Sequence, residues 1–167
     1  MTASELRQRA SHIRLLITDV DGVLTDNGVY YSDKGEELKR FSIRDGMGVE
    51  RLRNLAGIET GIITGEKSGS VSRRAEKLQI TELHLGVNDK LQKLNEVLER
   101  KNFKPDEIAF IGDDINDFEI MNRAGIAACP ADAMEIIKTI AQFICLNRGG
   151  HGAFREFAEW LIAARSE

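Results

Sequence analysis

Short apolar segments alternate with amphipathic segments along most of the 167 residues. The apolar segments have the length of strands that are buried on both faces, and the segments between them have helical spacing with one apolar side. We predict strands at 14–18, 60–64, 82–86, 107–112, 125–130 and 143–146, and helices at 45–57, 68–78, 89–102, 115–125, 132–141 and 153–164. This alternation predicts one α/β domain in which helices cover both faces of a doubly wound, mostly parallel sheet.

One segment, residues 28–42, departs from the alternation. Two stretches of mixed polar and apolar residues flank the turn sequence Asp33 to Gly35, which predicts a β-hairpin. The hairpin carries four large apolar side chains, Tyr30, Tyr31, Leu38 and Phe41. Because an isolated hairpin is marginal in water, these side chains favour packing in an oligomer, with an ordinary surface hairpin as the alternative.

Charge and composition limit the partners of the chain. The net charge of −4 argues against nonspecific binding to nucleic acid. No apolar run reaches membrane-spanning length, and the polar N-terminus lacks the apolar core of a signal peptide, so we expect a cytoplasmic protein without a membrane partner. Cys129 and Cys145 form no metal-binding pattern and fit buried thiols in a reducing compartment.

Side chains suited to catalysis follow four of the predicted strands. Asp19 and Asp21 follow the first strand, Thr64 ends the second, Lys90 comes just after the third, and Asp113, Asp114 and Asp117 follow the fourth. In parallel α/β sheets, ligands bind outside the carboxyl ends of the strands. We therefore expect these groups to meet at one edge of the sheet.

The expected chemistry is that of a metal ion and a phosphate. Asp19 and Asp21 are two residues apart, so an extended backbone would direct them to the same side, and Asp113 would join them if its strand neighbours the first. Carboxylates this close repel one another unless a cation intervenes, and a site with few oxygen ligands favours Mg²⁺. Lys90 and Thr64 could then hold a phosphate, with backbone amides near Gly65 assisting.

The strongest candidate for a nucleophile is a carboxylate. The sequence contains no GxSxG motif, and "GIITGEKS" departs from a Walker loop in its glycine spacing. Asp19 could attack phosphorus and form an aspartyl-phosphate. Asp21 could protonate the departing alkoxide and then deprotonate the water that hydrolyses the intermediate.

These motifs resemble those of a known superfamily. "DVDGV" at 19–23, Thr64, Lys90 and "GDDIND" at 112–117 are similar to the four motifs of the haloacid dehalogenase superfamily. The resemblance implies a Rossmann-like fold, with Asp19 as nucleophile, Asp21 as general acid and base, and Thr64 and Lys90 as phosphoryl binders. It also implies Mg²⁺ bound by Asp19, the Asp21 carbonyl and Asp113, with Asp114 and Asp117 in support.

A closer resemblance is to one capless subgroup. The chain carries the hairpin but no large cap domain, and "FSIRDGMG" at 41–48 and "RGGHGAFRE" at 148–156 are similar to stretches of the 3-deoxy-D-manno-octulosonate 8-phosphate phosphatase family. This resemblance implies a sugar-acid phosphate as substrate and a homotetramer whose hairpins pack together. A neighbour's glycine-rich tail, about 147–167, would close each active site. The implied substrate-binding residues are Arg44, Asp45, Gly46, Gly65, Glu66 and Arg74.

Two alternatives stay open at this point. Octulosonate phosphatases commonly carry an arginine where this chain has Glu66, and phosphatases of the nine-carbon 2-keto-3-deoxynononate 9-phosphate resemble "TGEKS" better. An arginine could pair with a substrate carboxylate, whereas Glu66 would prefer sugar hydroxyls. A phospho-accepting receiver module also combines acids, Thr and Lys, but Asp21, two residues past Asp19, favours hydrolysis.

Overall fold

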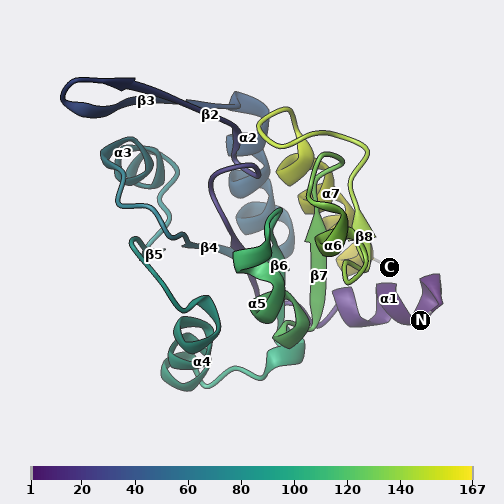
Figure 1. The fold of residues 1–167 in the computed structure, drawn as a ribbon. Helices are drawn as coiled ribbons and strands as arrows, with labels where there is room; N and C mark the ends of the chain where they lie inside the picture. The colour runs from purple at the N-terminus through teal and green to yellow at the C-terminus, as the bar shows by residue number, and fades with distance from the viewer. Residues whose placement is uncertain (1, 167) are drawn as a thin grey trace.

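A computed structural model describes residues 2–166 of the chain (Figure 1). Its helices and strands are, in chain order, α1 (Ala3–Ala10), β1 (Leu15–Thr18), β2 (Thr25–Ser32), β3 (Gly35–Phe41), α2 (Ile43–Arg51), the π-helix η1 (Leu52–Ala56), β4 (Glu59–Ile63), α3 (Gly69–Lys77), β5 (Glu82–His84), α4 (Lys90–Lys101), the 3₁₀ turn η2 (Pro105–Glu107), β6 (Ile108–Ile111), the 3₁₀ turn η3 (Ile115–Asp117), α5 (Phe118–Arg123), β7 (Ile126–Cys129), α6 (Glu135–Lys138), β8 (Phe143–Ile144) and α7 (Ala153–Ser166).

The predicted doubly wound sheet is confirmed. Six strands lie in the order β5-β4-β1-β6-β7-β8, and every neighbouring pair is parallel. Residues of α2, α3 and α7 share one apolar cluster with one face of the sheet, and residues of α4, α5 and α6 share a second cluster with the other face. Along β1, Leu16 packs into the first cluster, while Leu15 and Ile17 pack into the second. Burial on both faces explains why these strands are apolar throughout.

The strand order creates a switch point beside β1. From β1 the chain proceeds through β4 and β5 on one side, then returns to β6 on the other side and continues through β7 and β8. Connections therefore diverge above the carboxyl ends of β1 and β6, which leaves a crevice there in open α/β sheets. The residues that follow these two strands are Asp19 and Asp113.

The hairpin forms a separate two-stranded sheet of β2 and β3 that projects from the body (Figure 1). Its first strand, β2, begins three residues earlier than predicted, because Thr25 pairs with Phe41 at the base. The turn lies between Ser32 and Gly35, as the sequence predicted.

Three local features differ from the sequence-based expectations. The polar N-terminus forms α1, in which Thr2 and Glu5 make a reciprocal capping box. The helix that begins in α2 ends in the π-helical turn η1 before Gly57, whose φ of 64° closes it. The helix predicted at 132–141 shortens to α6, because Asp132 accepts the amide of Gly149 and the Met134 amide donates to the Asp113 carbonyl.

Among residues 2–166, no helix has the length and apolar character needed to cross a bilayer.

The C-terminal segment is part of the core. Phe154, Phe157 and Leu161 of α7 are fully buried, and the Phe157 ring lies 5.2 Å from that of Phe143 and 5.8 Å from that of Trp160. The glycines before α7 lie against the loop that follows β1 of the same chain. A Cβ atom on Gly149 would fall 1.8 Å from the Gly22 carbonyl oxygen, so this approach requires glycine.

We predict that Phe157→Ala destabilises the protein by about 3–5 kcal/mol, because it removes a fully buried ring and leaves a cavity. The measurement is urea unfolding followed by circular dichroism. Leu146→Ala is the matched control, since Leu146 is 90% exposed and its truncation should change the free energy of unfolding by less than about 0.5 kcal/mol. Equal midpoints for the two variants would contradict the place of α7 in the core.

Candidate active site

Two buried carboxylates face each other at the carboxyl ends of β1 and β6. The Asp19 side chain is 7% exposed, and its amide donates to the Ile111 carbonyl at 3.0 Å, which ties the two strand ends together. Carboxylate oxygens of Asp19, Asp113 and Asp117 all lie within 4.8 Å of one another. The expectation that Asp113 follows a strand beside β1 is therefore confirmed by the parallel pairing of β1 with β6.

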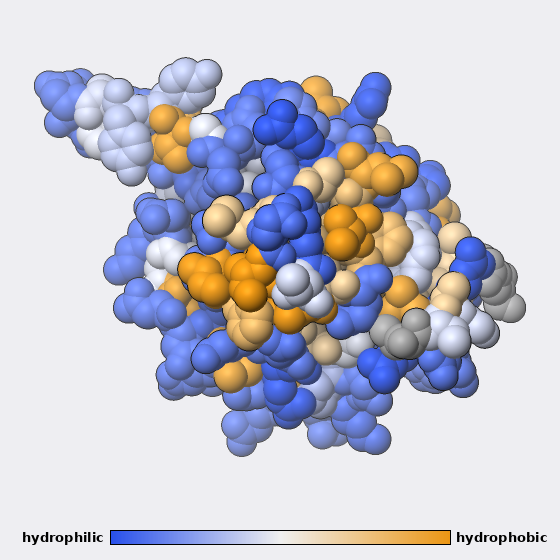
Figure 2. Space-filling view, turned by 45° about the vertical axis from the view of Figure 1, so that its right-hand side comes forward, coloured by the Kyte–Doolittle hydropathy of each residue, from blue (hydrophilic) through white to orange (hydrophobic). Residues whose placement is uncertain are grey.

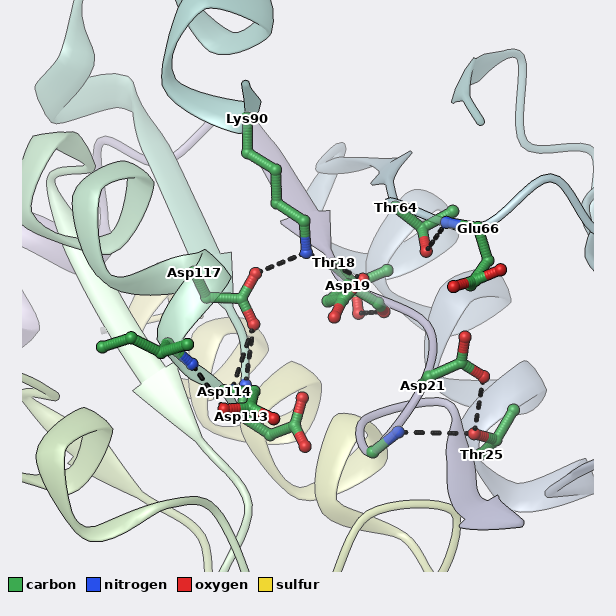
Figure 3. A network of polar contacts seen from close by, with 12 residues as sticks. Thr18, Asp19, Asp21, Thr25, Thr64, Glu66, Lys90, Asp113, Asp114 and Asp117 are labelled. Atoms are coloured by element: carbon green, nitrogen blue, oxygen red, sulfur yellow. Dashed lines mark hydrogen bonds and ion pairs between the residues drawn. The ribbon is translucent and has the colours of Figure 1, made fainter. Parts of the chain in front are cut away.

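Lys90, the first residue of α4, enters this cluster from the side (Figure 3). Its ammonium lies 2.6 Å from Asp117 Oδ1 and 3.0 Å from Asp19 Oδ1. The other Asp117 oxygen accepts the backbone amides of Asp113 and Asp114, at 3.0 and 3.4 Å. Asp117 is thus fully engaged and holds both Lys90 and the loop after β6, whereas Asp19 and Asp113 line a cavity at the strand ends.

Burial and mutual repulsion perturb the two facing carboxyls. Burial raises the pKa of Asp19 to about 7; repulsion from Asp117 adds to this effect and Lys90 opposes it. Burial likewise raises the pKa of Asp113 to about 8, with further repulsion from Asp19, Asp117 and Asp114. Burial alone would lower the pKa of Lys90, but its carboxylate partners raise it, so Lys90 remains a cation.

The site fits a divalent cation. Asp113 Oδ1 is buried and accepts no hydrogen bond, and Asp19 Oδ1 is buried with only the Lys90 ammonium beside it, at 3.0 Å. Buried carboxylate oxygens without partners are costly, and the hard oxygen donors present here are those that bind Mg²⁺. The acidic residues Asp19, Asp21, Glu66, Asp113 and Asp114 also line the cavity, so a phosphate dianion needs a counter-charge to enter. Asp19 and Asp113 would bind such a cation.

We predict that Mg²⁺ binds more weakly as the pH falls. Below about pH 7, the metal-free protein carries protons on Asp19 and Asp113, and binding must release them. Affinity should therefore be at least about tenfold lower at pH 6 than at pH 8.5. Both raised pKa values favour the folded state at low pH, and this contribution to stability is lost as the pH rises. Because Mg²⁺ binds more tightly at pH 8.5, it should raise the melting temperature more at that pH. Calorimetric titration in two buffers of different ionisation enthalpy measures the proton release; none at pH 7 would contradict this prediction.

Asp21 reaches the cavity through a turn. The strand ends at Thr18, and the amides of Val23 and Leu24 donate to the Val20 carbonyl, so a tight turn follows Val20. Asp21 lies at the start of this turn rather than within the strand. Gly22 makes the turn with a φ of 83°, and a Cβ atom there would meet Asp113 Oδ2 at 1.9 Å. Both side chains nevertheless line one cavity.

The cavity has a volume of about 220 Å³, and Thr64, Gly65 and Glu66 form its second side. Thr64 follows β4 and is 2% exposed, and its hydroxyl accepts the Glu66 amide at 3.5 Å (Figure 3). Asp114 lies at the rim, where its carboxylate caps the amide of Ile115 at 2.6 Å. Groups from four strand ends therefore converge, as the sequence predicted.

The other four residues singled out for substrate binding lie outside this cavity. Asp45 is buried and accepts the amides of Gly152 and Arg155, which caps the N-terminus of α7. Arg74 donates to the Ser42 carbonyl at 2.8 Å, and a Cβ atom on Gly46 would meet its guanidinium at 2.4 Å. The fourth residue, Arg44, is exposed at the start of α2. Asp45 is thus engaged with α7, and Gly46 packs against Arg74 near the start of α2.

Sequence reasoning missed two residues of the site. Asn27 lines the cavity and donates to Asp113 Oδ2 at 3.3 Å, from a backbone with a φ of 67°. Asparagine tolerates this left-handed conformation better than most residues, which was the one available signal. Lys39 of β3 lies 2.5 Å from Asp21 Oδ2. An alternating hairpin sequence gives no sign that one of its lysines is buried.

Comparisons with known proteins agree with this geometry. Residues 63–156 match the family model of haloacid dehalogenase-like hydrolases. The chain is 39% identical over 165 residues to the 3-deoxy-D-manno-octulosonate 8-phosphate phosphatase of Yersinia pestis, covering 99% of this chain and 88% of that protein. The crystal structure of the Yersinia pestis phosphatase superposes with a TM-score of 0.93, covering 99% of this chain and 89% of that chain.

Two further solved structures contain metal. The Moraxella catarrhalis phosphatase of the same name, in complex with magnesium, phosphate and KDO, is 34% identical with a TM-score of 0.94 over 99% of this chain and 94% of that chain. The cobalt-bound Haemophilus influenzae phosphatase is 33% identical, with a TM-score of 0.92 over 95% of this chain and 92% of that chain.

The fold, the acidic site and these matches define a haloacid dehalogenase-like hydrolase that acts on phosphoric monoesters. Such phosphatases use a divalent metal ion. Within this class, the chain belongs to the 3-deoxy-D-manno-octulosonate 8-phosphate phosphatase family.

Proposed function

We propose that this protein is a Mg²⁺-dependent phosphatase that hydrolyses 3-deoxy-D-manno-octulosonate 8-phosphate to the free sugar acid and phosphate. The observation that carries the proposal is the meeting of Asp19, Asp113 and Lys90 at the switch point of the sheet, with Asp21 and Thr64 lining the same cavity. The names of the most similar relatives support the choice of substrate.

In the proposed reaction, Asp19 attacks the phosphorus and forms an aspartyl-phosphate while the bond to the sugar oxygen breaks. Asp21 donates a proton to the departing alkoxide, then accepts one from the water that hydrolyses the intermediate. Lys90 and the Thr64 hydroxyl hold the phosphoryl oxygens, with the Gly65 and Glu66 segment beside them. A bound Mg²⁺ would offset the negative charge of the carboxylates and polarise a phosphoryl oxygen.

The eight-carbon substrate is preferred over the nine-carbon alternative in this proposal. Glu66, the residue that raised the alternative, does line the cavity. However, the curated relatives from Yersinia pestis, Escherichia coli and Salmonella typhimurium are named octulosonate phosphatases, which supports the eight-carbon substrate. The alternative of a phospho-accepting receiver module is not retained, because the chain matches a family of hydrolases.

A direct test compares kcat/KM for the eight-carbon and nine-carbon phosphates with Mg²⁺. We expect the eight-carbon substrate to be preferred by at least about tenfold, since a pocket shaped for one sugar loses contacts with the other. A preference for the nine-carbon phosphate would overturn the proposed substrate while leaving the phosphatase activity in place. No phosphate release from either substrate would overturn the proposal as a whole.

We also propose self-association, with a homotetramer as the expected assembly. The hairpin projects from the body in Figure 2, and its Val29, Tyr30, Tyr31 and Leu38 are between 37% and 70% exposed. Exposed apolar side chains on a projecting hairpin support packing against other copies. Light scattering should give four times the 18.6 kDa chain mass. The glycine-rich segment that was expected to reach a neighbour lies against its own chain at Gly149 and Gly150.

A further inference from the structure

The hairpin contributes a buried cation to the edge of the active site. Lys39 of β3 has a side chain that is 0% exposed, although its neighbours Leu38 and Arg40 are exposed. Its ammonium lies 2.5 Å from Asp21 Oδ2 and 3.5 Å from Glu36 Oε2. Burial alone would lower the pKa of Lys39, but these two carboxylates raise it. A buried ammonium with two acidic partners is a fixed charge with a defined direction.

Asp21 has little else to hold its side chain. It sits in the turn after β1, outside the sheet, and its carboxylate is 21% exposed. Its other oxygen accepts a hydrogen bond from the Thr25 hydroxyl at 3.4 Å, a long and weak contact. The contact with Lys39 is therefore the short, charge-assisted one that sets the carboxylate's direction.

The position of Lys39 depends on contacts between the hairpin and α3, which lie outside the active-site cavity. Glu36 accepts a short hydrogen bond from the Ser68 hydroxyl, and Ser68 caps the start of α3 through the Val71 amide. Figure 1 shows the hairpin lying over α3, so this contact docks the hairpin on the body. Lys39 is not among the residues that line the cavity, and so it acts through Asp21.

We propose that Lys39 is a positioning residue that holds the Asp21 carboxylate in the direction needed for proton transfer. The inference rests on the role proposed for Asp21 as general acid and base. It assigns the hairpin a part in the chemistry of its own chain, beyond any part in assembly. A small misplacement of an acid can cost about 10²-fold in rate, because proton transfer depends steeply on geometry.

The test uses Lys39→Met, with Lys34→Met in the exposed hairpin turn as the matched control. For the sugar-acid phosphate, whose alkoxide must be protonated, we expect Lys39→Met to lower kcat by about 10- to 100-fold. For p-nitrophenyl phosphate, which has a good leaving group, the pre-steady-state burst of nitrophenolate should stay within about threefold of wild type. Lys34→Met should change neither. Equal losses for both substrates would indicate general damage and overturn the proposal.

A double-mutant cycle separates action through Asp21 from other effects. If Lys39 acts through Asp21, adding Lys39→Met to Asp21→Asn should change kcat by less than about threefold. A further tenfold loss would overturn the proposal. If Asp21→Asn itself retains turnover of the sugar-acid phosphate, the role proposed for Asp21 fails. If Asp21→Asn loses turnover and Lys39→Met retains it, only the inference on Lys39 fails.

A second variant covers the case in which Lys39→Met does not fold, as judged by its melting curve. Glu36→Ala keeps the ammonium but removes its second partner and the contact with Ser68. We expect it to lower kcat for the sugar-acid phosphate by about three- to tenfold, again with a preserved burst. Unchanged kcat for a folded Glu36→Ala variant would overturn the proposal.

Discussion

Asp19→Asn should lower turnover by on the order of 10⁴-fold or more, because an amide cannot act as the nucleophile that forms the aspartyl-phosphate. The fold should survive, since the asparagine has the same shape and removes a charge that burial disfavours. Burial raises the pKa of Asp19 to about 7, so the metal-free site stabilises the neutral form relative to water. Phosphate release at saturating substrate and Mg²⁺, together with a melting curve, measures both effects.

Asp26→Asn provides the matched control for this substitution. Asp26 lies nearby in β2, but its carboxylate pairs with Arg40 at 3.4 Å, away from the cavity. The same chemical change there should leave kcat within about twofold, as for most exposed ion pairs. If Asp19→Asn retained wild-type turnover in a protein shown to be free of deamidation, Asp19 would not be the nucleophile.

Asp21→Asn should lower kcat for the sugar-acid phosphate by about 10²- to 10⁴-fold, the usual contribution of a positioned acid. The alkoxide of a sugar is a poor leaving group, and asparagine cannot donate the proton that it requires. With p-nitrophenyl phosphate, the burst of nitrophenolate should persist, while steady-state turnover falls because the same residue activates the hydrolytic water. Rapid mixing with detection of nitrophenolate separates the two steps.

A contrary result for Asp21 would be equally clear. If Asp21→Asn slowed the burst as much as the steady state, the residue would act on phosphoryl transfer itself. Asp114→Asn is the useful comparison, because Asp114 also lines the cavity but its carboxylate serves as a helix cap for Ile115. We expect it to lower kcat by less than about tenfold, in line with the modest energy of a cap.

Much of the site could be predicted because the apolar runs of the sequence mark where the strands end. A polar residue after an apolar run marked a strand end, and Asp19, Thr64 and Asp113 were found in this way. Lys90 was found just past the third strand, at the start of the next helix. The pairing of β1 with β6 then brought Asp113 to Asp19. The two-residue spacing of Asp19 and Asp21 gave no sign that Lys39 pairs with Asp21.

Residues brought in by the hairpin and the C-terminal segment could not be predicted. Asn27 and Lys39 enter the site because the hairpin folds back over the loop after β1. Asp45 is committed to the N-terminus of α7, a contact across more than a hundred residues. No local pattern reports such partners, since an aspartate in a helix start looks the same whether it caps a distant helix or binds a ligand.

The sequence by itself therefore determined the class of fold, the order of its elements and the acidic residues at the strand ends, because apolar periodicity and turn residues record local burial directly. The tertiary structure decided which strand ends meet, which way each carboxylate points and which cation forms an ion pair with it. These depend on strand order and on packing between distant segments. The pairing of Asp21 with Lys39 is the clearest case, because both residues are visible in the sequence and only the docked hairpin joins them.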